Sequence, residues 1–410
     1  MRSSIHLSHR LEALPPYLAA DIKARVSALK KEGADIIDLS VGSPDFPPDH
    51  RIVDAAREVL ESEEGHGYVI GRGGLRLREA AAAYMARRYG VEVDPASQVL
   101  VLLGSKEGLA HLPIALCNPG EVGVYPDPGY PVYEPTLRLA GARPVPLPLD
   151  PDRDWRPQWD RLDASISALE SRDNGDRGDV VVRLVILNYP HNPTSATAEL
   201  ADFDAAIEWA GGHGAVTVND NAYADIGFDG YRPPGILQAP RALGGRPGSG
   251  VVEFHSMSKT FSMAGWRCGF AVGDPEVISA LARVKSYYDT GGFAAVQHGA
   301  VTALDLAGEI APQVSERYRA RRDVLLAALS PLGLVAETPK ATIYLWARLP
   351  EPGADDAAYC RDLLDRAHVA LSPGSGYGRQ GRGYVRFSLT APEDRLLEAV
   401  TRLKRFGETG

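Results

Sequence analysis

Residues 254–267 read Phe254-His-Ser-Met-Ser-Lys-Thr-Phe-Ser-Met-Ala-Gly-Trp-Arg267. They follow a short apolar run that is typical of a buried strand, so Lys259 is expected on a loop just beyond a strand end. A lysine amine can form a Schiff base with an aldehyde, and Ser256, Ser258 and Arg267 carry groups that hold a phosphate. The stretch therefore predicts a site for a phosphorylated aldehyde, in a fold whose strands end at a ligand.

The competing interpretation of Lys259 is a solvated surface lysine, as most lysines are. Phe261 and Trp266 lie close by in the sequence, and Arg267 follows the lysine at an offset of eight residues. A solvated lysine requires none of these neighbours, so the pattern favours the cofactor site.

The composition excludes several classes of protein. The chain has 410 residues, 44% of them hydrophobic, which suffices for a large core in two domains. No apolar run approaches the roughly 20 residues that span a bilayer, and the polar start lacks a signal peptide's apolar segment, so we expect a cytoplasmic protein without a membrane partner. The net charge of -9 and the scattered Lys and Arg residues argue against nucleic acid. The three cysteines and ten histidines form no metal-binding pattern.

Helical patterns alternate with short apolar runs between about residues 50 and 280. These runs are continuous in Val, Ile and Leu, which is typical of strands buried on both faces. The alternation predicts an α/β fold with a mostly parallel sheet. A long helical pattern and two strand patterns after about residue 310 indicate a smaller α+β domain. We expect an N-terminal arm with part of the small domain at residues 1–45, a large domain at 46–310 and the rest of the small domain at 311–410.

A glycine-rich segment, Gly104-Ser-Lys-Glu-Gly108, follows one of the predicted strands and precedes a helical run. Small residues let a phosphate approach the unpaired N–H groups at a helix N-terminus. By itself, the segment is equally consistent with an ordinary turn.

Two further strand ends carry polar residues that suit an aromatic ring with an oxygen and a nitrogen atom. In an open parallel sheet, ligands bind beyond the carboxyl ends of the strands, so these positions are expected to meet. The amide of Asn192 could donate to a phenolate oxygen, and Tyr223 could bond to the same oxygen. Asp220 can keep a pyridinium nitrogen protonated, which makes the ring an electron sink. The alternatives are an Asn-Pro turn for Asn192 and a helix cap for Asp220.

An aromatic residue and an arginine complete the predicted site. Tyr130 ends the segment Pro126-Asp-Pro-Gly-Tyr130, where it could stack on a flat ring or simply pack in a turn. In Tyr384-Val-Arg-Phe-Ser-Leu389, the alternation turns Arg386 to the opposite face from its neighbours. A strand arginine usually faces solvent, but here its fork could clamp a substrate carboxylate in a bidentate pair.

Together these segments resemble the aspartate aminotransferase superfamily, the fold-type I enzymes that use pyridoxal 5'-phosphate. Within it they resemble the branch that contains glutamate-pyruvate (alanine) and LL-diaminopimelate aminotransferases. The resemblance implies a fold-type I transferase with a seven-stranded type of sheet and covers nearly the whole chain. Its segments are Leu14-Pro-Pro-Tyr17, Asp38-Leu-Ser-Val-Gly-Ser-Pro-Asp45, Gly104-Ser-Lys-Glu-Gly-Leu-Ala-His111, Pro126-Asp-Pro-Gly-Tyr130, Asp220-Asn-Ala-Tyr-Ala-Asp225, Met263-Ala-Gly-Trp-Arg267 and Pro339-Lys-Ala-Thr-Ile-Tyr-Leu-Trp346.

The resemblance implies a role for each matching residue. Lys259 is the lysine that binds the cofactor and moves the proton, and Asp220 is the partner of the ring nitrogen. The site lies at a homodimer interface, where Tyr68 reaches the phosphate in the partner subunit. The other implied contacts are Asn192 and Tyr223 to the ring oxygen, Tyr130 to the ring face, Ser105, Lys106, Ser256, Ser258 and Arg267 to the phosphate, and Arg386, Asn192, Gly42 and Tyr17 to the substrate.

The implied reaction is a ping-pong transfer of an amino group between an L-amino acid and a 2-oxo acid. Glutamate with 2-oxoglutarate, or alanine with pyruvate, is expected as one pair. A lyase, decarboxylase or oxidase that tailors an unusual amino acid is the alternative, because its cofactor site would look the same. A dehydrogenase using Gly71-Arg-Gly-Gly74 lacks a preceding strand of useful length. A non-catalytic regulator would need a DNA-binding domain, which a 40-residue arm cannot supply.

The sequence departs from the branch's usual pattern at three places. His191 and Ser195 flank the Asn192 motif, where smaller residues are more usual, and Asp289-Thr-Gly-Gly-Phe293 differs before Gln297. By resemblance, this last segment contributes across the interface to the distal part of the substrate. The identity of the amino acid therefore stays open.

Overall fold

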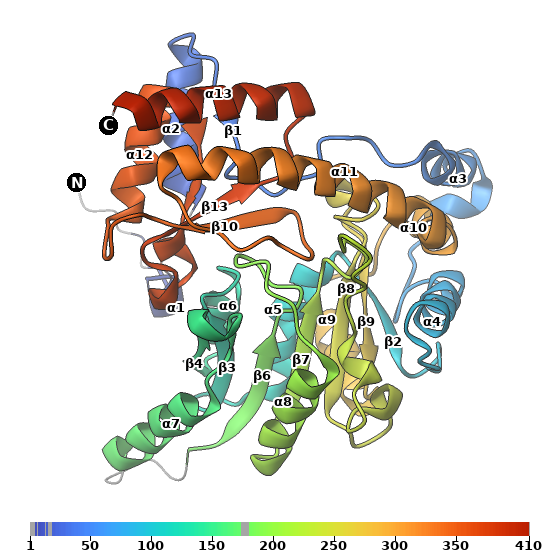
Figure 1. Cartoon of the computed structure of the whole chain (residues 1–410). Coiled ribbons are helices and arrows are strands. Elements are labelled where there is room, and N and C mark those ends of the chain that lie inside the picture. Colours follow the sequence, from blue (N-terminus) through green and yellow to red (C-terminus); the bar gives the residue numbers. More distant parts are fainter. Residues whose placement is uncertain (1–4, 6, 13, 15–18, 174–179, 410) are drawn as a thin grey trace.

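The computed structural model describes residues 5, 7–12, 14, 19–173 and 180–409. Among these residues, eight strands form one large sheet and three form a smaller one (Figure 1). The order in the large sheet is β2-β9-β8-β7-β6-β3-β4-β5. Its strands are β2 (Val99–Leu102), β3 (Val122–Asp127), β4 (Arg143–Asp150), β5 (Arg156–Pro157), β6 (Val182–Leu187), β7 (Val216–Asn221), β8 (Val251–Ser256) and β9 (Gly269–Gly273).

Most neighbouring strands of the large sheet run parallel. The parallel pairs are β3 with β4, β3 with β6, β6 with β7, and β7 with β8. Strand β9 runs antiparallel to both of its neighbours, and the two-residue β5 is antiparallel to β4. The predicted α/β fold with a mostly parallel sheet is confirmed, and β5 adds a short edge to the seven longer strands of the described chain.

Helices cover both faces of the large sheet, because successive strand residues point to opposite faces and both sets are apolar. Leu100 and Leu102 belong to one core and Val99 and Val101 to the other. The first core includes α5 (Ser105–Leu116), α6 (Tyr133–Leu139) and α9 (Pro275–Lys285). The second includes α4 (Leu75–Tyr89), α7 (Trp159–Asp173) and α8 (Leu200–Gly212).

The smaller sheet has the order β10-β13-β12 and lies above the large sheet in Figure 1. Beside it, β1 pairs in parallel with β11, which joins the beginning of the chain to its last quarter. The strands are β10 (Tyr344–Arg348), β12 (Ser372–Pro373), β13 (Tyr384–Ser388), β1 (Ile37–Asp38) and β11 (Val369–Ala370), and the helices α2 (Ala19–Lys31), α12 (Asp356–Ala367) and α13 (Glu393–Thr409).

A long helix, α11 (Ala307–Leu329), runs from α10 toward the smaller sheet (Figure 1). Helix α11 includes the predicted domain boundary at 310/311. Both predicted boundaries, at 45/46 and at 310/311, stay proposals. The remaining helices are α1 (His9–Glu12), α3 (His50–Leu60) and α10 (Ala294–Asp305), with 3-10 turns at Glu63–His66, Pro151–Arg153, Ile236–Gln238, Leu243–Gly245, Ala264–Trp266, Ser330–Leu332, Gly374–Tyr377 and Arg379–Gly381.

Three features bear on the classes of protein considered above. Within the described residues, no helix combines the length and apolar character that crossing a membrane requires. In the same part of the chain, no three His, Cys, Asp or Glu side chains are grouped so that they could hold a metal ion. Cys117, Cys268 and Cys360 are buried and free.

A buried arginine on α11 ties distant segments together. The Arg321 guanidinium donates to both oxygens of Asp45, at 2.7 and 2.8 Å, and to the Leu389 carbonyl at 3.0 Å. Arg321 is only 6% exposed. This arginine therefore fixes the segment after β1 and the end of β13 against the long helix, and both segments lead to the cavity described below.

Replacing Asp45 with alanine is expected to destabilise the protein, because it leaves the buried Arg321 charge without a counter-ion. We expect the free energy of unfolding to fall by about 2–4 kcal/mol in denaturant titrations. Asp362→Ala removes an exposed ion pair with Arg366 and should cost about 0.5 kcal/mol or less. Equal losses in the two variants would contradict the assignment.

Candidate active site

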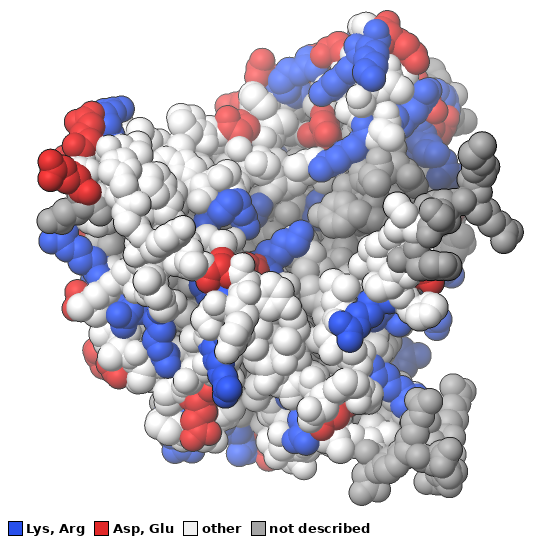
Figure 2. Space-filling model, turned by 180° about the vertical axis from the view of Figure 1, so that it is seen from behind, with Lys and Arg blue, Asp and Glu red and all other residues white. Residues whose placement is uncertain are grey.

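The carboxyl ends of the central parallel strands open into a cavity of about 470 Å³ between the two sheets. Lys and Arg side chains border a hollow near the middle of the face in Figure 2. The predicted site residues that line the cavity are Gly42, Ser105, Lys106, Tyr130, Asn192, Asp220, Tyr223, Ser256, Ser258, Lys259, Arg267 and Arg386. Two predicted residues are not among them: Tyr68 is 81% exposed elsewhere, and Tyr17 lies outside the described residues.

Lys259 lies three residues beyond the end of β8, and its side chain crosses the cavity toward the N-terminal segment. Its Nζ donates a hydrogen bond to the carbonyl oxygen of Gly42. Burial lowers the pKa of Lys259 from its ordinary value, and the nearby Arg386 and Arg267 charges add to that effect. A lowered pKa favours the neutral amine, which is the form that attacks a carbonyl carbon or accepts a proton.

Asp220 lies in β7 on the cavity floor and has one oxygen satisfied and one free. Its Oδ2 accepts a hydrogen bond from the Tyr133 hydroxyl at 2.8 Å, while Oδ1 finds no partner among the described residues. Burial raises the pKa of Asp220 to about 6. A carboxylate that lacks a partner at this depth fits a protonated ring nitrogen, which would satisfy Oδ1 and supply the missing positive charge.

The segment after β6 is fixed to β7 by a buried asparagine that was not predicted. Asn188 donates from Nδ2 to the Asp220 carbonyl at 2.6 Å, and its Oδ1 accepts from the Asn192 backbone N–H at 2.9 Å. The Asn192 Oδ1 in turn accepts a hydrogen bond from Arg386 at 2.7 Å. This bond leaves the Asn192 amide nitrogen as the group available to a ring oxygen, in agreement with the predicted donor.

Arg386, in β13, is a buried cation without a carboxylate partner. It is 5% exposed, and its two terminal nitrogens donate to Asn192 Oδ1 and to the Ser40 carbonyl, each at 2.7 Å. Its guanidinium carbon lies 3.9 Å from the Tyr344 ring centroid and 4.9 Å from that of Tyr377. No ion pair of the described residues involves Arg386. Its guanidinium can therefore pair with the carboxylate of a bound ligand.

Tyr344, in β10, joins the arginine to the other groups of the site. Tyr223 donates from its hydroxyl to the Tyr344 hydroxyl at 3.1 Å. Burial alone would raise the pKa of Tyr344, but the Arg386 and Lys259 charges bring it below its ordinary value. A Cβ added at Gly42 would lie 2.0 Å from the Tyr344 hydroxyl, so residue 42 must be glycine for this tyrosine to reach its place.

The other end of the cavity has the features of a phosphate site. Helix α5 begins at Ser105, directly after Gly104, whose φ of 83° suits glycine. The Arg267 guanidinium bonds to the Leu103 and Ala264 carbonyls at 3.2 and 2.8 Å, and a Cβ at Gly104 would lie 2.4 Å from it. A helix N-terminus, serine hydroxyls and this arginine together suit a dianion.

The divergent segment at residues 289–293 lies next to the loop that contains Tyr68. The buried Lys285 binds both oxygens of Asp289 at 2.7 Å and Glu107 of α5 at 3.2 Å. A Cβ at Gly291 would lie 2.0 Å from the Val69 carbonyl. The segment is thus fixed to α5 and packed against the Tyr68 loop, and it does not line the cavity in the described part of the chain.

The sequence reasoning missed four residues that contact the predicted site residues. Asn188, Tyr344 and Tyr377 line the cavity and contact Asn192 or Arg386. Tyr133 lies outside the lining and donates to Asp220. Asn188 is the first residue after β6, so the strand-end rule could have found it. Tyr133 follows Tyr130 by three residues, which is about one helical turn. Nothing in the local sequence indicates Tyr344 or Tyr377, because their roles depend on the fold.

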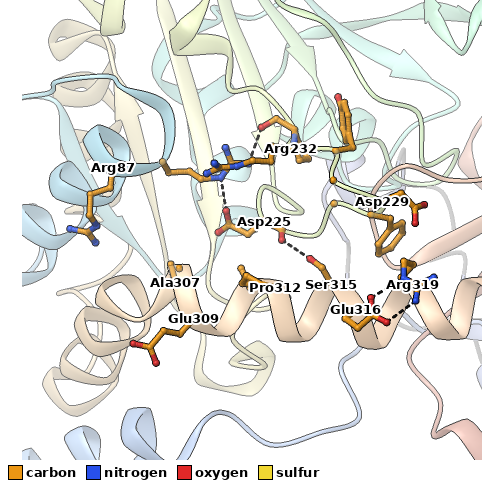
Figure 3. Close-up of a pocket in the computed structure, with 18 of the residues that line it drawn as sticks. Arg87, Asp225, Asp229, Arg232, Ala307, Glu309, Pro312, Ser315, Glu316 and Arg319 are labelled. Carbon is orange, nitrogen blue, oxygen red and sulfur yellow. Dashed lines mark hydrogen bonds and ion pairs between the residues drawn. The ribbon is translucent and has the colours of Figure 1, made fainter.

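A larger cavity of about 840 Å³ lies between α4, the segment after β7 and the start of α11 (Figure 3). Its charged groups largely satisfy one another: Arg88 pairs with Asp225 at 2.9 Å, and Arg319 with Glu316 at 2.7 Å. None of the predicted site residues lines it. The chemistry inferred from the sequence therefore belongs to the smaller cavity.

Comparison with known proteins identifies the family of the chain. The family model described as aminotransferase class I and II matches residues 34–403, and the chain therefore belongs to that family. It is 41% identical to an LL-diaminopimelate aminotransferase of Desulforudis audaxviator (96% of each chain) and 39% identical to that of Aquifex aeolicus (97% of this chain, 98% of the relative). An aminotransferase structure from Staphylococcus aureus superposes with a TM-score of 0.85 at 31% identity, covering 98% of this chain and 99% of that one.

The protein is thus a pyridoxal 5'-phosphate-dependent aminotransferase of fold type I. The residues present fit the cofactor: the unpartnered Asp220 Oδ1 suits its ring nitrogen, and the glycine-lined start of α5 beside Arg267 suits its phosphate. The individual contacts remain predictions.

The Asp220 carboxyl is expected to make the cofactor-free protein less stable as the pH rises. Its folded pKa, about 6, exceeds the ordinary 3.8, so its stabilising contribution is complete below pH ~4 and is lost as the pH rises through about 6. Asp220→Asn removes this titration. Between pH 5 and pH 8 we expect the variant to gain about 1–2 kcal/mol of unfolding free energy relative to the wild type.

Denaturant titrations of the cofactor-free proteins at the two pH values measure this difference. Asp160→Asn, an exposed position on α7, serves as the control. A stability difference between Asp220→Asn and the wild type that is the same at both pH values would refute the buried titration.

Proposed function

We propose that this aminotransferase moves an amino group between an L-amino acid and a 2-oxo acid, with glutamate and 2-oxoglutarate or alanine and pyruvate as one pair. The observation that carries the proposal is Arg386, a buried guanidinium without a counter-ion that lines the same cavity as Lys259. Amino acids and 2-oxo acids share an α-carboxylate. A single clamp can therefore hold the donor of one half-reaction and the acceptor of the other.

In this proposal Arg386 and Lys259 have different roles. Arg386 binds the α-carboxylate and orients the substrate, while Asn192 and the Ser40 carbonyl hold the guanidinium in place. Burial lowers the pKa of Lys259 and so favours its neutral amine. In this form Lys259 takes the proton from the substrate Cα and returns it. The bound cofactor supplies an electron sink for that carbon. Positioned proton transfer of this kind contributes about 10²- to 10⁴-fold to the rate.

The names of the relatives suggest a first specific substrate. Two relatives that match almost the full chain, at 39% and 41% identity, are named LL-diaminopimelate aminotransferases. We therefore infer that LL-diaminopimelate, an amino acid of lysine biosynthesis, is the first amino donor to test beside glutamate and alanine. Activity confined to other donors would place this chain outside that specificity.

Replacing Lys259 with alanine is expected to lower turnover by at least about 10²-fold, because the proton is left without its carrier. The absorbance band of the lysine-bound cofactor should disappear as well. Lys404→Ala, an exposed lysine on α13, is the matched control and should keep both. Full activity in Lys259→Ala would contradict the assignment.

The half-reaction separates transamination from the lyase, decarboxylase or oxidase alternative. With an amino acid alone, the proposed enzyme should convert its cofactor to the aminated form and release a 2-oxo acid in equal amount. Ammonia, carbon dioxide or peroxide as the main product would favour the alternative.

We further propose a homodimer with shared active sites. Exposed apolar side chains concentrate on the Tyr68 loop and the segment packed against it: Tyr68, Ile70, Tyr287, Tyr288 and Phe293 are between 48% and 85% exposed. Exposed large apolar side chains in number are typical of a protein–protein contact. Tyr68 on this surface is the residue expected to reach the cofactor of the second subunit.

Analytical ultracentrifugation of the holoenzyme should give twice the 44.1 kDa mass of one chain. Mixing Lys259→Ala with Tyr68→Phe chains tests the sharing, because a mixed dimer has one site with native Lys259 and native Tyr68. We expect the mixture to bind cofactor more tightly than Tyr68→Phe alone. A monomer, or a mixture equal to the average of its parents, would refute the shared site.

A further inference from the structure

His191 and Ser195, which depart from the branch's usual sequence, lie in the turn that follows β6. The turn is closed at both ends: the Ser195 N–H donates to the His191 carbonyl, and the His191 N–H donates to the Ala196 carbonyl, each at 2.9 Å. The buried His191 ring bonds to the Thr194 hydroxyl at 2.8 Å, and burial lowers the pKa of His191 to about 3, so the ring is neutral at neutral pH. Asn192 belongs to the same turn and is held in place with it.

Ser195 connects this turn to the smaller sheet. Its hydroxyl donates to the Tyr344 carbonyl at 2.9 Å and lies 2.7 Å from the Thr342 hydroxyl oxygen. That oxygen accepts a hydrogen bond from the Tyr344 backbone N–H at 3.2 Å. Because the only hydroxyl proton of Ser195 is used on the carbonyl, Thr342 must be the donor between the two hydroxyls. The three residues form a closed hydrogen-bond cycle, in which each hydroxyl donates once and accepts once.

The hydrogen-bond cycle is almost completely buried, and its backbone is unusual. Ser195 has a φ of 62° and Thr342 a φ of 79°, in the left-handed region that residues other than glycine rarely adopt. Such conformations persist only where the surrounding structure holds them, and they are frequent at functional sites. The cycle supplies contacts of this kind, and glycine at position 195 could not supply them.

The cycle joins two groups that contact the carboxylate-binding arginine of the proposed function, on which this inference rests. Asn192, in the turn, accepts a hydrogen bond from Arg386 at 2.7 Å. The Tyr344 ring centroid lies 3.9 Å from the guanidinium carbon of the same arginine. Ser195 is not among the residues that line the active-site cavity, so it can act on a substrate only through these neighbours.

Strand β10 is also attached to the large sheet by backbone bonds that do not involve Ser195. The Thr342 N–H donates to the Ile226 carbonyl at 3.0 Å, and the Phe228 N–H donates to the Lys340 carbonyl at 2.8 Å. These bonds connect the beginning of β10 to the segment after β7. Loss of the Ser195 hydroxyl therefore leaves the two sheets attached and changes how precisely they are aligned.

We propose that Ser195 is a positioning residue for carboxylate binding. Its hydroxyl fixes the turn that carries Asn192 relative to the strand that carries Tyr344, and thereby fixes the Arg386 guanidinium that both contact. A displacement of about 1 Å in such a group can reduce the rate by about 10²-fold. Without the hydroxyl, the Tyr344 carbonyl and the Thr342 hydroxyl lose their partner, and the turn is free to shift.

The first experiment measures the kinetics of Ser195→Ala, which removes the hydroxyl and keeps the Cβ. With glutamate and 2-oxoglutarate, both KM values of the holoenzyme should rise about tenfold, while kcat changes by less than about threefold, because Lys259 belongs to a different segment. Ser165→Ala, which removes an exposed hydroxyl on α7, is the matched control and should keep both constants.

Thr342 allows an independent test with a conservative rescue. Thr342→Val removes the hydroxyl at nearly constant shape and should raise the KM values as Ser195→Ala does. Thr342→Ser keeps the hydroxyl and should stay close to the wild type. The double variant Ser195→Ala/Thr342→Val should be no worse than either single variant, because both changes break the same cycle.

The third experiment measures binding to the cofactor-free protein, where no turnover takes place. Butyrate carries a single carboxylate, and it should raise the unfolding temperature of the wild type more than chloride does at equal ionic strength. All samples contain inorganic phosphate, so that the phosphate end of the cavity is equally occupied. Ser195→Ala and Thr342→Val should lose most of the butyrate effect, and Ser165→Ala should keep it.

The outcomes separate this inference from the proposed function. KM values within about twofold of the wild type in Ser195→Ala, or equal losses in Thr342→Ser and Thr342→Val, would overturn the role of Ser195. Transamination by the wild type would still support the proposed function. If glutamate does not react, the proposed pair fails, and the butyrate shifts of wild type and variants decide the role of Ser195. A wild type that neither reacts nor responds to butyrate contradicts both.

Discussion

The Arg386 guanidinium is almost fully buried, and its hydrogen bonds to the protein end on the neutral oxygens of Asn192 and Ser40. A buried charge without a counter-ion is costly, so the surrounding structure must hold it firmly. The fold does so with groups from three distant parts of the chain: the segment after β1, the segment after β6, and the face of Tyr344 in β10. The two sheets are thus positioned relative to each other around one unpaired cation. The same cation then gives the enzyme its affinity for carboxylates.

Much of this arrangement could be predicted from the sequence, because parallel strands deliver their next residues to one edge of a sheet. Asp220 and Lys259 follow or end apolar runs that are easy to recognise, and both line the cavity. The mostly parallel order of the sheet follows from the same runs. Arg386 was found because it alternates with apolar neighbours in a strand. Local pattern was sufficient wherever a residue's role depends on its place at a strand end.

The other contacts depend on packing between distant segments, which no local pattern contains. Tyr133 reaches Asp220 only because the fold brings the start of α6 to the end of β7, and Tyr344 reaches Tyr223 only because the small sheet covers the large one. The antiparallel β9 was also beyond periodicity, since an apolar run has the same composition in either direction. Tyr68 stands apart for a different reason: it is exposed on this chain, and its expected role lies in a second copy.

Gly42 and Tyr344 are separated by about three hundred residues, yet each limits what the other can be. The glycine leaves the space that the tyrosine hydroxyl occupies, and ring carbons of the same tyrosine lie 2.6 Å from where a Cβ would be. A change at position 42 is therefore tolerated only after the aromatic ring has shortened or moved, which makes the two sites epistatic. Related sequences should show them varying together. Libraries that randomise the two positions separately will sample mostly combinations that cannot assemble the site.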